Sequence, residues 1–466
     1  MARDAAGRAS TIDAPLLSTG VVGLDRILGG GIPAKQILLL AGFPGSGKTI
    51  LAGQMAFASA SRGDPVVLAT AASEPHSKLI ESLHGFEFFR REMLGPEIVL
   101  LSVYPWLRKG VRETREMLLS SIRERRAHLL VLDGLRSLHD VWRDDSSIRE
   151  FLGELGVGLA SSDCTGVLTL ECAPDRVLES AEAATVDGVV VLHSVRSAMR
   201  NLRRVEVVKV RGRPHIPGEH VARLDASGFR VAPRVDALEP RERYPVRREG
   251  RARFGIAGLD GWLGGGLPGG SATVIAGDSG AGKTLLAVAF ARTGAMAGEP
   301  TLFASLEEDG ESLLARARAL GMDLALGPAL AVWSPSPVAL EPDEIAQEIL
   351  LRAGTMNARR VVVDGVDLLD QGLQPGQRRT EFHEALLRRL RGEGRDVLFT
   401  SHLPASSGAP LSRAVDNLLE ARAERRVGQI HRELWAVKVR SGNSPREAWR
   451  FNITVQVGIA PEAVTR

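Results

Sequence analysis

A phosphate-loop signature lies in the second half of the chain, where the sequence reads Gly277-Asp278-Ser279-Gly280-Ala281-Gly282-Lys283-Thr284. Its spacing is G-x-x-x-x-G-K-[ST], between an apolar run that predicts a strand and a second run that predicts a helix. Glycines let successive backbone N–H groups turn toward a triphosphate, and the helix N-terminus adds positive potential. We predict that Lys283 contacts the β- and γ-phosphates and that Thr284 ligates Mg²⁺. The alternative is a glycine-rich turn that binds no ligand. That alternative would not explain why the motif lies between a predicted strand and a predicted helix.

The chain of 466 residues repeats this signature. A second loop, Gly42-Phe43-Pro44-Gly45-Ser46-Gly47-Lys48-Thr49, lies 235 residues earlier. The segment Gly23-Leu24-Asp25, followed by three glycines, returns at the same offset as Gly258-Leu259-Asp260. Two motifs in one register indicate a tandem duplication. In the first loop we expect nucleotide contacts from Gly42, Pro44, Gly45, Ser46, Gly47, Lys48 and Thr49, and in the second from Gly277, Ser279, Gly280, Ala281, Gly282, Lys283 and Thr284.

Both copies alternate apolar strands with helices, which predicts an α/β fold with a mostly parallel sheet covered on both faces. Hairpins are expected near the end of each copy, at 189–209 and 417–438. We predict a tail at 1–15, domains at 16–231 and 254–466, and a linker at 232–253. The linker is rich in Pro and Arg, and its interspersed acids favour a solvated connection over a nucleic-acid or lipid patch.

An aspartate ends an apolar strand in each copy, at Asp133 and Asp364. Such a residue can cap the next helix, but with a phosphate loop upstream we expect it to organise Mg²⁺ together with Thr49 or Thr284. Hydrolysis also needs a carboxylate to polarise the attacking water.

In the second copy a strand ends in Glu307-Glu308, at the sheet edge where open α/β folds bind ligands. A solvated acidic turn is the alternative. In the first copy the matching positions are Ala72 and Ser73, and Glu74 comes one residue late before Pro75. We therefore expect the first copy to bind nucleotide and to hydrolyse it poorly, unless a shift of one residue restores Glu74.

A basic pair follows late in each copy, Lys209 with Arg211 and Lys438 with Arg440. Strand alternation places both side chains of a pair on one face. They could protect an exposed edge strand, but their recurrence favours contacts to the γ-phosphate of a neighbouring subunit.

The composition fits a cytoplasmic globular protein, with 44% hydrophobic residues and a net charge of +3. Cys164 and Cys172 are too few for a disulfide framework and predict buried thiols in a reducing compartment. We find no signal-peptide pattern and no apolar run long enough to cross a membrane.

Together, these motifs resemble the KaiC family within the RecA-like ATPases, over nearly the whole chain. The resemblance implies two tandem RecA-like domains, a two-tiered homohexameric ring with ATP at subunit interfaces, and a role as a signalling switch or scaffold with a protein partner. It also implies that Lys438 and Arg440, and Lys209 and Arg211 in the other tier, reach a neighbour's ATP.

Two departures from the family pattern qualify that expectation. Clock-type members carry the glutamate pair in both copies, and autokinase members have adjacent Ser and Thr acceptors where this chain has Ser412-Arg413. A two-site phosphorylation cycle is therefore not expected, and serine autokinase activity would rest on Ser412 alone. The long C-terminal tail of clock proteins is also missing, so we predict no circadian clock.

Two other functions remain open from the sequence. A RecA/RadA-type motor would bind DNA through loops after the aspartate strand, but the short loop 371–377 lacks an aromatic residue, and the chain has only two tyrosines. An assembly module that binds ATP without turnover is the other alternative. Loss of activity on changing Glu307 and Glu308 would separate it from an ATPase.

Overall fold

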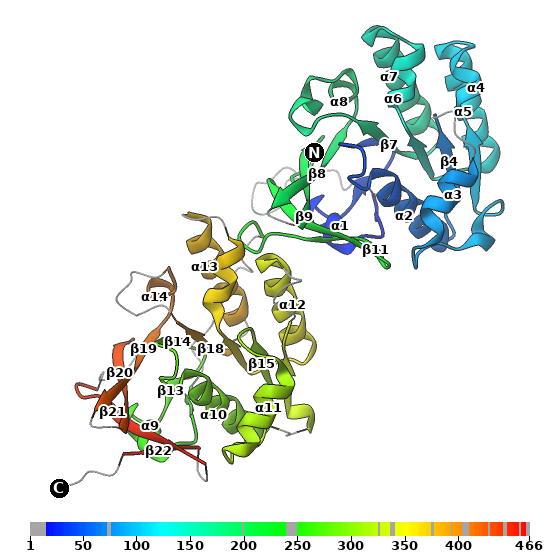
Figure 1. Cartoon of the computed structure of the whole chain (residues 1–466). Helices are drawn as coiled ribbons and strands as arrows, with labels where there is room; N and C mark the ends of the chain where they lie inside the picture. The colour runs from blue at the N-terminus through cyan, green and yellow to red at the C-terminus, as the bar shows by residue number, and fades with distance from the viewer. Residues whose placement is uncertain are drawn as a thin grey trace, which may run out of the picture. The chain divides into compact units, whose positions relative to one another are not determined.

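The computed structural model divides the chain into two compact units, Met1–Ala237 and Leu238–Arg466. It describes residues 15–71, 76–197, 200–238, 249–324, 327–335, 341–373, 377–392, 394–402, 410–426, 429–440, 445–455 and 458–462. Ala72, Ser73 and Glu74, residues 374–376 of the loop 371–377 and the middle of the linker lie outside these residues. The helices and strands of both units are labelled in Figure 1.

The first unit is built on a nine-stranded sheet in the order β11-β10-β9-β8-β3-β7-β6-β4-β5. Its strands are β3 (Ile37–Gly42), β4 (Val66–Thr70), β5 (Ile98–Ser102), β6 (Leu129–Asp133), β7 (Thr165–Glu171), β8 (Gly188–Ser197), β9 (Arg200–Val210), β10 (Glu219–Asp225) and β11 (Gly228–Ala232). The short strands β1 (Leu16–Leu17) and β2 (Ile32–Pro33) form a separate pair. The helices are α1 (Val22–Ile27), α2 (Lys48–Ser61), α3 (His76–His84), α4 (Tyr104–Leu107), α5 (Val111–Arg125), α6 (Arg136–Val141), α7 (Asp145–Ser161) and α8 (Ala181–Thr185), with 3₁₀ turns η1 (Arg91–Met93) and η2 (Pro174–Glu179).

The second unit has the matching strand order, β22-β21-β20-β19-β14-β18-β17-β15-β16. Its strands are β14 (Ala272–Gly277), β15 (Thr301–Ser305), β16 (Leu330–Trp333), β17 (Arg360–Asp364), β18 (Asp396–Ser401), β19 (Asn417–Arg426), β20 (Gln429–Val439), β21 (Trp449–Thr454) and β22 (Gly458–Pro461), with β12 (Arg251–Ala252) and β13 (Leu267–Pro268) as a separate pair. The helices are α9 (Ala257–Trp262), α10 (Lys283–Met296), α11 (Gly310–Ala319), α12 (Pro342–Thr355), α13 (Gln377–Arg391) and α14 (Pro410–Ala414), with 3₁₀ turns η3 (Gly327–Ala329) and η4 (Val366–Gly372).

Both sheets confirm the predicted α/β class, because the strands around the phosphate-loop strand pair in parallel. In the first unit β3 lies between β7 and β8, and in the second β14 lies between β18 and β19. The predicted hairpins are β8–β9 and β19–β20, which pair antiparallel. All strands of the parallel part therefore bring their carboxyl ends to one edge of each sheet, where the phosphate loop also lies.

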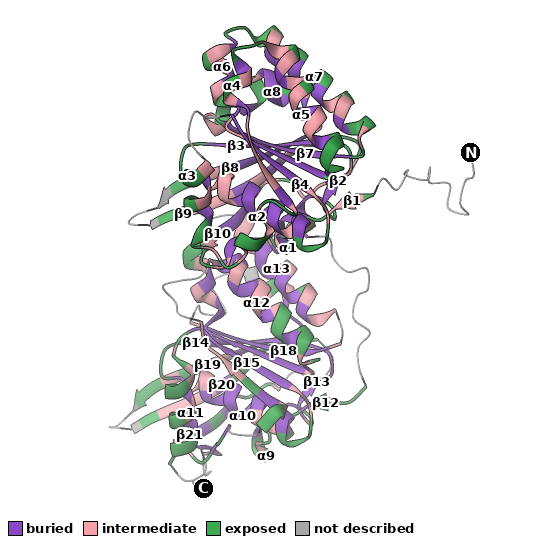
Figure 2. Ribbon diagram, turned by 90° about the vertical axis from the view of Figure 1, so that its right-hand side faces the viewer, coloured by how far each residue is buried: buried purple, intermediate pink, exposed green. Residues whose placement is uncertain are grey.

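Helices cover both faces of each sheet because the central strands are apolar on both sides. Along β3, Ile37 and Leu39 belong to one core cluster, and Leu38 and Leu40 belong to the other. Figure 2 shows these strands as buried, with exposed residues on the outer faces of the helices. This explains why the strands read as nearly continuous apolar runs instead of alternating ones.

The repeated Gly-Leu-Asp segment has a structural role. Asp25 accepts a hydrogen bond from the backbone N–H of Thr19, and Asp260 accepts from those of Phe254 and Gly255. Each aspartate thereby fixes the chain that leads into the short helix α1 or α9.

Two sequence expectations need a comment. Cys164 is buried and Cys172 is only half-buried, so the expectation of two buried thiols is met in full at the first position only. Within the described residues, no helix is long and apolar enough to cross a membrane.

Candidate functional site

Both phosphate loops have a backbone that only glycine accommodates. Gly277 has a φ of 142°, and a Cβ there would lie 1.9 Å from the carbonyl oxygen of Ala421 on β19. In the first unit, a Cβ on Gly42 would lie 2.3 Å from the carbonyl oxygen of Leu192 on β8. The loop therefore packs directly against the neighbouring strand, which places it at the carboxyl edge of the sheet.

The helix after each loop begins without a side-chain cap. Gly47 and Gly282 stand at the N-cap positions of α2 and α10 in left-handed conformation, and neither helix start receives a side-chain hydrogen bond. An uncapped N-terminus leaves backbone N–H groups available to an anion. This observation fits phosphate binding at both loops.

The loop lysines are buried at the sheet edge. Lys283 donates to the carbonyl oxygen of Asp278 at 2.9 Å, and Lys48 donates to those of Gly42 and Phe43 at 3.0 and 2.9 Å. Burial lowers the pKa of both lysines, whereas nearby carboxylates raise it, led by Glu307 for Lys283 and by Glu171 for Lys48. Each lysine is thus held in its loop by carbonyl groups that a phosphate could replace.

The predicted Mg²⁺ ligands lie together in both units. The hydroxyl of Thr284 is 3.2 Å from Oδ1 of Asp364, and that of Thr49 is 3.1 Å from both carboxylate oxygens of Asp133. Burial raises the pKa of Asp133, and it raises that of Asp364 to about 6. Oδ2 of Asp364 is buried, and none of the described residues offers it a hydrogen bond.

These residues fit a magnesium ion. A hydroxyl and a carboxylate are the hard oxygen ligands that Mg²⁺ prefers, and the ion usually takes its other ligands from water and phosphate. The described residues contain no group of three or more His, Cys, Asp or Glu side chains suited to hold a metal alone. Asp364 would supply its unpartnered oxygen to the ion.

A threonine behind each aspartate was not identified from the sequence. Thr400 on β18 donates to Oδ1 of Asp364 at 2.6 Å and accepts from the N–H of Gly365 at 2.8 Å. In the first unit Thr169 makes the same two contacts, with Asp133 at 2.6 Å and Gly134 at 2.9 Å. Its recurrence at the matching place in β7 and β18 is the signal that could have revealed it.

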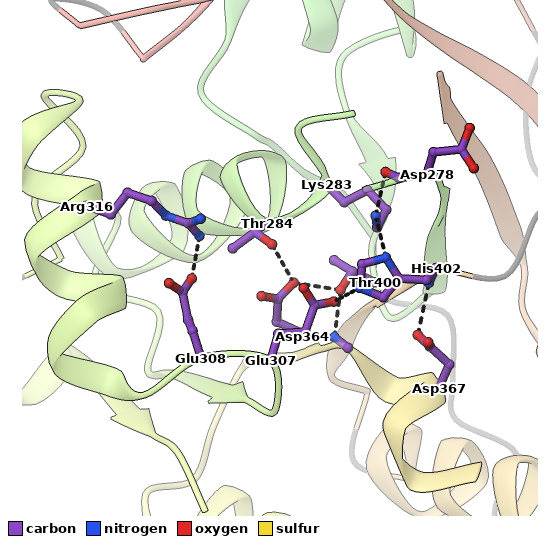
Figure 3. A network of polar contacts seen from close by, with 11 residues as sticks. Asp278, Lys283, Thr284, Glu307, Glu308, Arg316, Asp364, Asp367, Thr400 and His402 are labelled. Carbon is purple, nitrogen blue, oxygen red and sulfur yellow. Dashed lines mark hydrogen bonds and ion pairs between the residues drawn. The ribbon is translucent and has the colours of Figure 1, made fainter. Parts of the chain in front are cut away.

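The two adjacent glutamates point to different partners (Figure 3). Oε1 of Glu307 lies 2.8 Å from Nε2 of His402, next to the phosphate-loop lysine, whereas Glu308 pairs with Arg316 on α11. Burial raises the pKa of Glu308, and Arg316 opposes that effect. Of the pair, Glu307 is the carboxylate that the structure brings to Lys283.

The first unit lacks a glutamate at the position of Glu307. Thr70 pairs with Asp133 between β4 and β6, just as Ser305 pairs with Asp364 between β15 and β17. Two residues beyond these pairs the chain has Ala72 in the first unit and Glu307 in the second. The strand register thus supports the alignment made from the sequence, and Ala72, Ser73 and Glu74 themselves lie outside the described residues.

The basic pairs lie at the opposite end of the sheet from their own phosphate loop. The backbone N–H of Arg440 donates to the carbonyl oxygen of Asp416. The backbone N–H of Asp416 in turn donates to the carbonyl oxygen of Ala272, at the start of β14. Lys438 donates to the carbonyl oxygens of Ser412 and Val415 at 3.3 and 2.7 Å, and Arg440 lies 3.7 Å from Asp416.

The first unit repeats this arrangement at the start of β3. Lys209 donates to the carbonyl oxygens of Ala183 and Val186, and Arg211 pairs with Asp187 at 3.2 Å. Within one chain the two lysines bond carbonyl groups at the ends of α8 and α14, and the two arginines pair with the aspartates that follow these helices. The structure does not bring these four cations to the phosphate loop of their own unit.

The similarity to known proteins extends over both units. A family model described as the KaiC ATPase matches residues 17–236 and again residues 252–461. The chain belongs to the KaiC family of ATPases. This assignment confirms the resemblance seen in the sequence, with two tandem RecA-like α/β domains and nucleotide binding as the family's property.

Matches to individual relatives cover most of this KaiC-family chain. It is 26% identical over 468 residues to the circadian clock protein KaiC3 of Synechocystis, covering 94% of this chain and 90% of that protein. It is 24% identical over 371 residues to the circadian clock oscillator protein KaiC of Picosynechococcus, covering 77% of this chain and 71% of that protein.

Proposed function

We propose that this KaiC-family chain is a Mg²⁺-dependent ATPase whose second unit hydrolyses ATP, while its first unit binds nucleotide with little turnover. The observation that carries the proposal is the position of Glu307 beside Lys283 and Asp364, against alanine at the matching position 72. A carboxylate near the γ-phosphate is what orients and polarises the attacking water.

Each side chain then has one task. Lys283 and the N–H groups at the start of α10 hold the β- and γ-phosphates, and Thr284 and Asp364 hold Mg²⁺. When bound, the ion neutralises charge that develops on the phosphate oxygens. Glu307 accepts a hydrogen bond from the water and fixes its direction of attack. Glu308 lies next to Glu307 in the chain, and its ion pair with Arg316 holds the end of the strand in position.

The chain is further proposed to act as a homohexameric ring with ATP between subunits. This proposal is supported by the positions of the phosphate loop and of the pair Lys438 and Arg440, which lie at opposite ends of β14. A head-to-tail contact between copies closes into a ring and would bring Lys438 and Arg440 of one subunit to the loop of the next. Lys209 and Arg211 would do the same for the first unit.

Such a ring would serve as a cytoplasmic signalling switch or scaffold with a protein partner. The two free cysteines fit a reducing compartment. Autokinase activity would use Ser412 on α14, which lies at the same sheet edge as Lys438 and would therefore meet the phosphates of a neighbouring copy in such a ring. Mass spectrometry of protein incubated with Mg-ATP, with Ser412→Ala as the control, tests that phosphorylation.

Release of inorganic phosphate tests the main proposal. The purified chain is expected to release phosphate from Mg-ATP, and Glu307→Gln/Glu308→Gln is expected to lose that activity while still binding nucleotide. An inactive wild-type protein that binds ATP would identify an assembly module instead. The mass of the nucleotide-bound protein, measured by light scattering, tests the ring.

A further inference from the structure

The imidazole of His402 lies between the two residues to which the proposed function gives binding and water activation. Its Nδ1 is 3.3 Å from Nζ of Lys283, and its Nε2 is 2.8 Å from Oε1 of Glu307 (Figure 3). No pattern in the sequence predicts a role for His402. It follows β18 directly, two residues after Thr400.

The partners on either side fix the state of the ring. An ammonium group has hydrogens only to donate, so Lys283 must donate to Nδ1. A neutral imidazole that accepts at Nδ1 carries its hydrogen on Nε2, and that hydrogen points at the carboxylate of Glu307. The hydrogen bonds therefore run in one direction, from Lys283 through His402 to Glu307.

The backbone of His402 is fixed as well. Its N–H donates to Oδ1 of Asp367 on η4 at 3.0 Å, and only Gly365 separates η4 from the strand that ends in Asp364. The backbone of His402 is therefore anchored to the element that follows the predicted Mg²⁺ ligand. A side chain held at both its backbone and its ring can position a neighbour.

The first unit has a different residue at this place. Glu171 pairs with Gly42 between β7 and β3, and His402 comes one residue after Ser401, which pairs with Ala276 between β18 and β14. Gly42 and Gly277 open the two loops, so Glu171 and His402 are equivalent. The first unit thus differs from the second at both positions, with Ala72 for Glu307 and Glu171 for His402.

We propose that His402 is the positioning residue of the second unit, holding Glu307 for water activation and coupling it to the phosphate-loop lysine. The inference rests on the proposed hydrolysis by the second unit. By donating from Nε2, His402 engages Oε1 of Glu307 and leaves Oε2 to accept from water. Without it, Glu307 is free to rotate away, so kcat falls while nucleotide binding by the loop persists.

Two conservative variants separate the contacts of the ring. The amide of Gln reaches the place of Nε2 and can donate to Glu307, whereas the amide of Asn reaches the place of Nδ1 and can meet only Lys283. We expect His402→Asn and His402→Ala to lower kcat on the order of 10- to 100-fold with KM little changed. His402→Gln is expected to retain most of kcat.

His431→Asn is the matched control. His431 is also a half-buried histidine of the second unit paired with a glutamate, Glu462, at 3.0 Å, but it lies on β20. It should leave kcat and KM unchanged. Equal activity of the Asn and Gln variants, or wild-type kcat in His402→Ala, would overturn the proposal.

A second readout does not depend on turnover. In nucleotide-free protein with ¹⁵N-labelled histidine, the signal that disappears in His402→Gln should show the Nε2–H tautomer of a neutral ring. An Nδ1–H tautomer would contradict the proposal, because that ring cannot accept from Lys283.

The outcomes distinguish this inference from the proposed function. If Glu307→Gln leaves hydrolysis intact, the proposed function fails whatever the histidine variants do. If Glu307→Gln abolishes hydrolysis and His402→Ala has the kcat of wild type, only the role of His402 is wrong.

Discussion

The hydroxyl of Thr400 donates a 2.6 Å hydrogen bond to Oδ1 of Asp364, across two neighbouring strands of the second unit. Through the same oxygen it accepts from the N–H of Gly365. Thr400 therefore aims the aspartate that we assign to Mg²⁺, and it fixes the chain that leaves the strand.

The first prediction concerns this contact. Thr400→Val keeps the shape of the side chain and removes the hydroxyl, so Mg²⁺ should bind more weakly, by about 10- to 100-fold as for other partners of metal ligands. The Mg²⁺ concentration that half-activates ATP hydrolysis measures the effect. Thr400→Ser should remain close to wild type, and Thr169→Val makes the matched change in the first unit without loss of turnover. A Thr400→Val protein with unchanged Mg²⁺ requirement would refute the role.

The second prediction concerns the burial of Asp364. Burial raises the pKa of this carboxyl from 3.8 to about 6, so between those values the folded state holds a proton that the unfolded state has released. The folded state is therefore destabilised as pH rises through this window, by roughly 3 kcal/mol once pH exceeds the folded pKa.

Asp364→Asn should remove this penalty. With Mg²⁺ and nucleotide absent, the variant should be more stable than wild type at pH 8, and the difference should vanish near pH 4. Denaturant unfolding in EDTA at both pH values measures it. A variant that is destabilised equally at both pH values would show that the ionised carboxylate carries no such penalty.

The third prediction concerns Gly365, which has a φ of 81° beside Glu307. A Cβ at this position would lie 2.5 Å from Cγ of Glu307, so Gly365→Ala should displace the glutamate and lower kcat on the order of 100-fold. Gly134→Ala makes the same change in the first unit, at a φ of 92°, and should leave turnover intact. If both variants lose activity equally, backbone strain and not the position of Glu307 is responsible.

The fourth prediction concerns the proposed contact between subunits. Arg440 is about half exposed, and its partner Asp416 keeps Arg391 at 3.0 Å, so Arg440→Ala should fold. Pure Arg440→Ala and pure Lys283→Ala proteins should both be nearly inactive. Mixed rings should regain activity, because a wild-type loop can then meet a wild-type arginine from its neighbour. If the mixtures stay inactive although the rings are shown to exchange subunits, Arg440 takes no part in the reaction.

The sequence allowed prediction of those parts of the site that are local in the chain. The phosphate loops, the strand-terminal Asp133 and Asp364, and the α/β class all follow from short patterns, because each depends on neighbours in sequence. The repeat added the register, so Ala72 could be set against Glu307 before any strand pairing was known.

The contacts made across strands could not be predicted in this way. Thr400 is 36 residues from Asp364, and His402 is 119 residues from Lys283, so no local pattern joins them. Glu307 and Glu308 also point in different directions because they pair with His402 and Arg316, and no local sequence pattern connects these partners with them. The positions of the four basic residues relative to their own loops needed the strand register.

The most direct test of the account compares steady-state ATP hydrolysis with Mg²⁺ in wild type, Lys48→Ala and Lys283→Ala, which change equivalent lysines in the two loops. Glu307→Gln serves as the fourth protein. The account predicts that hydrolysis disappears in Lys283→Ala and Glu307→Gln and largely survives in Lys48→Ala. Loss of most turnover in Lys48→Ala, with retention in Glu307→Gln, would contradict it and assign hydrolysis to the first unit.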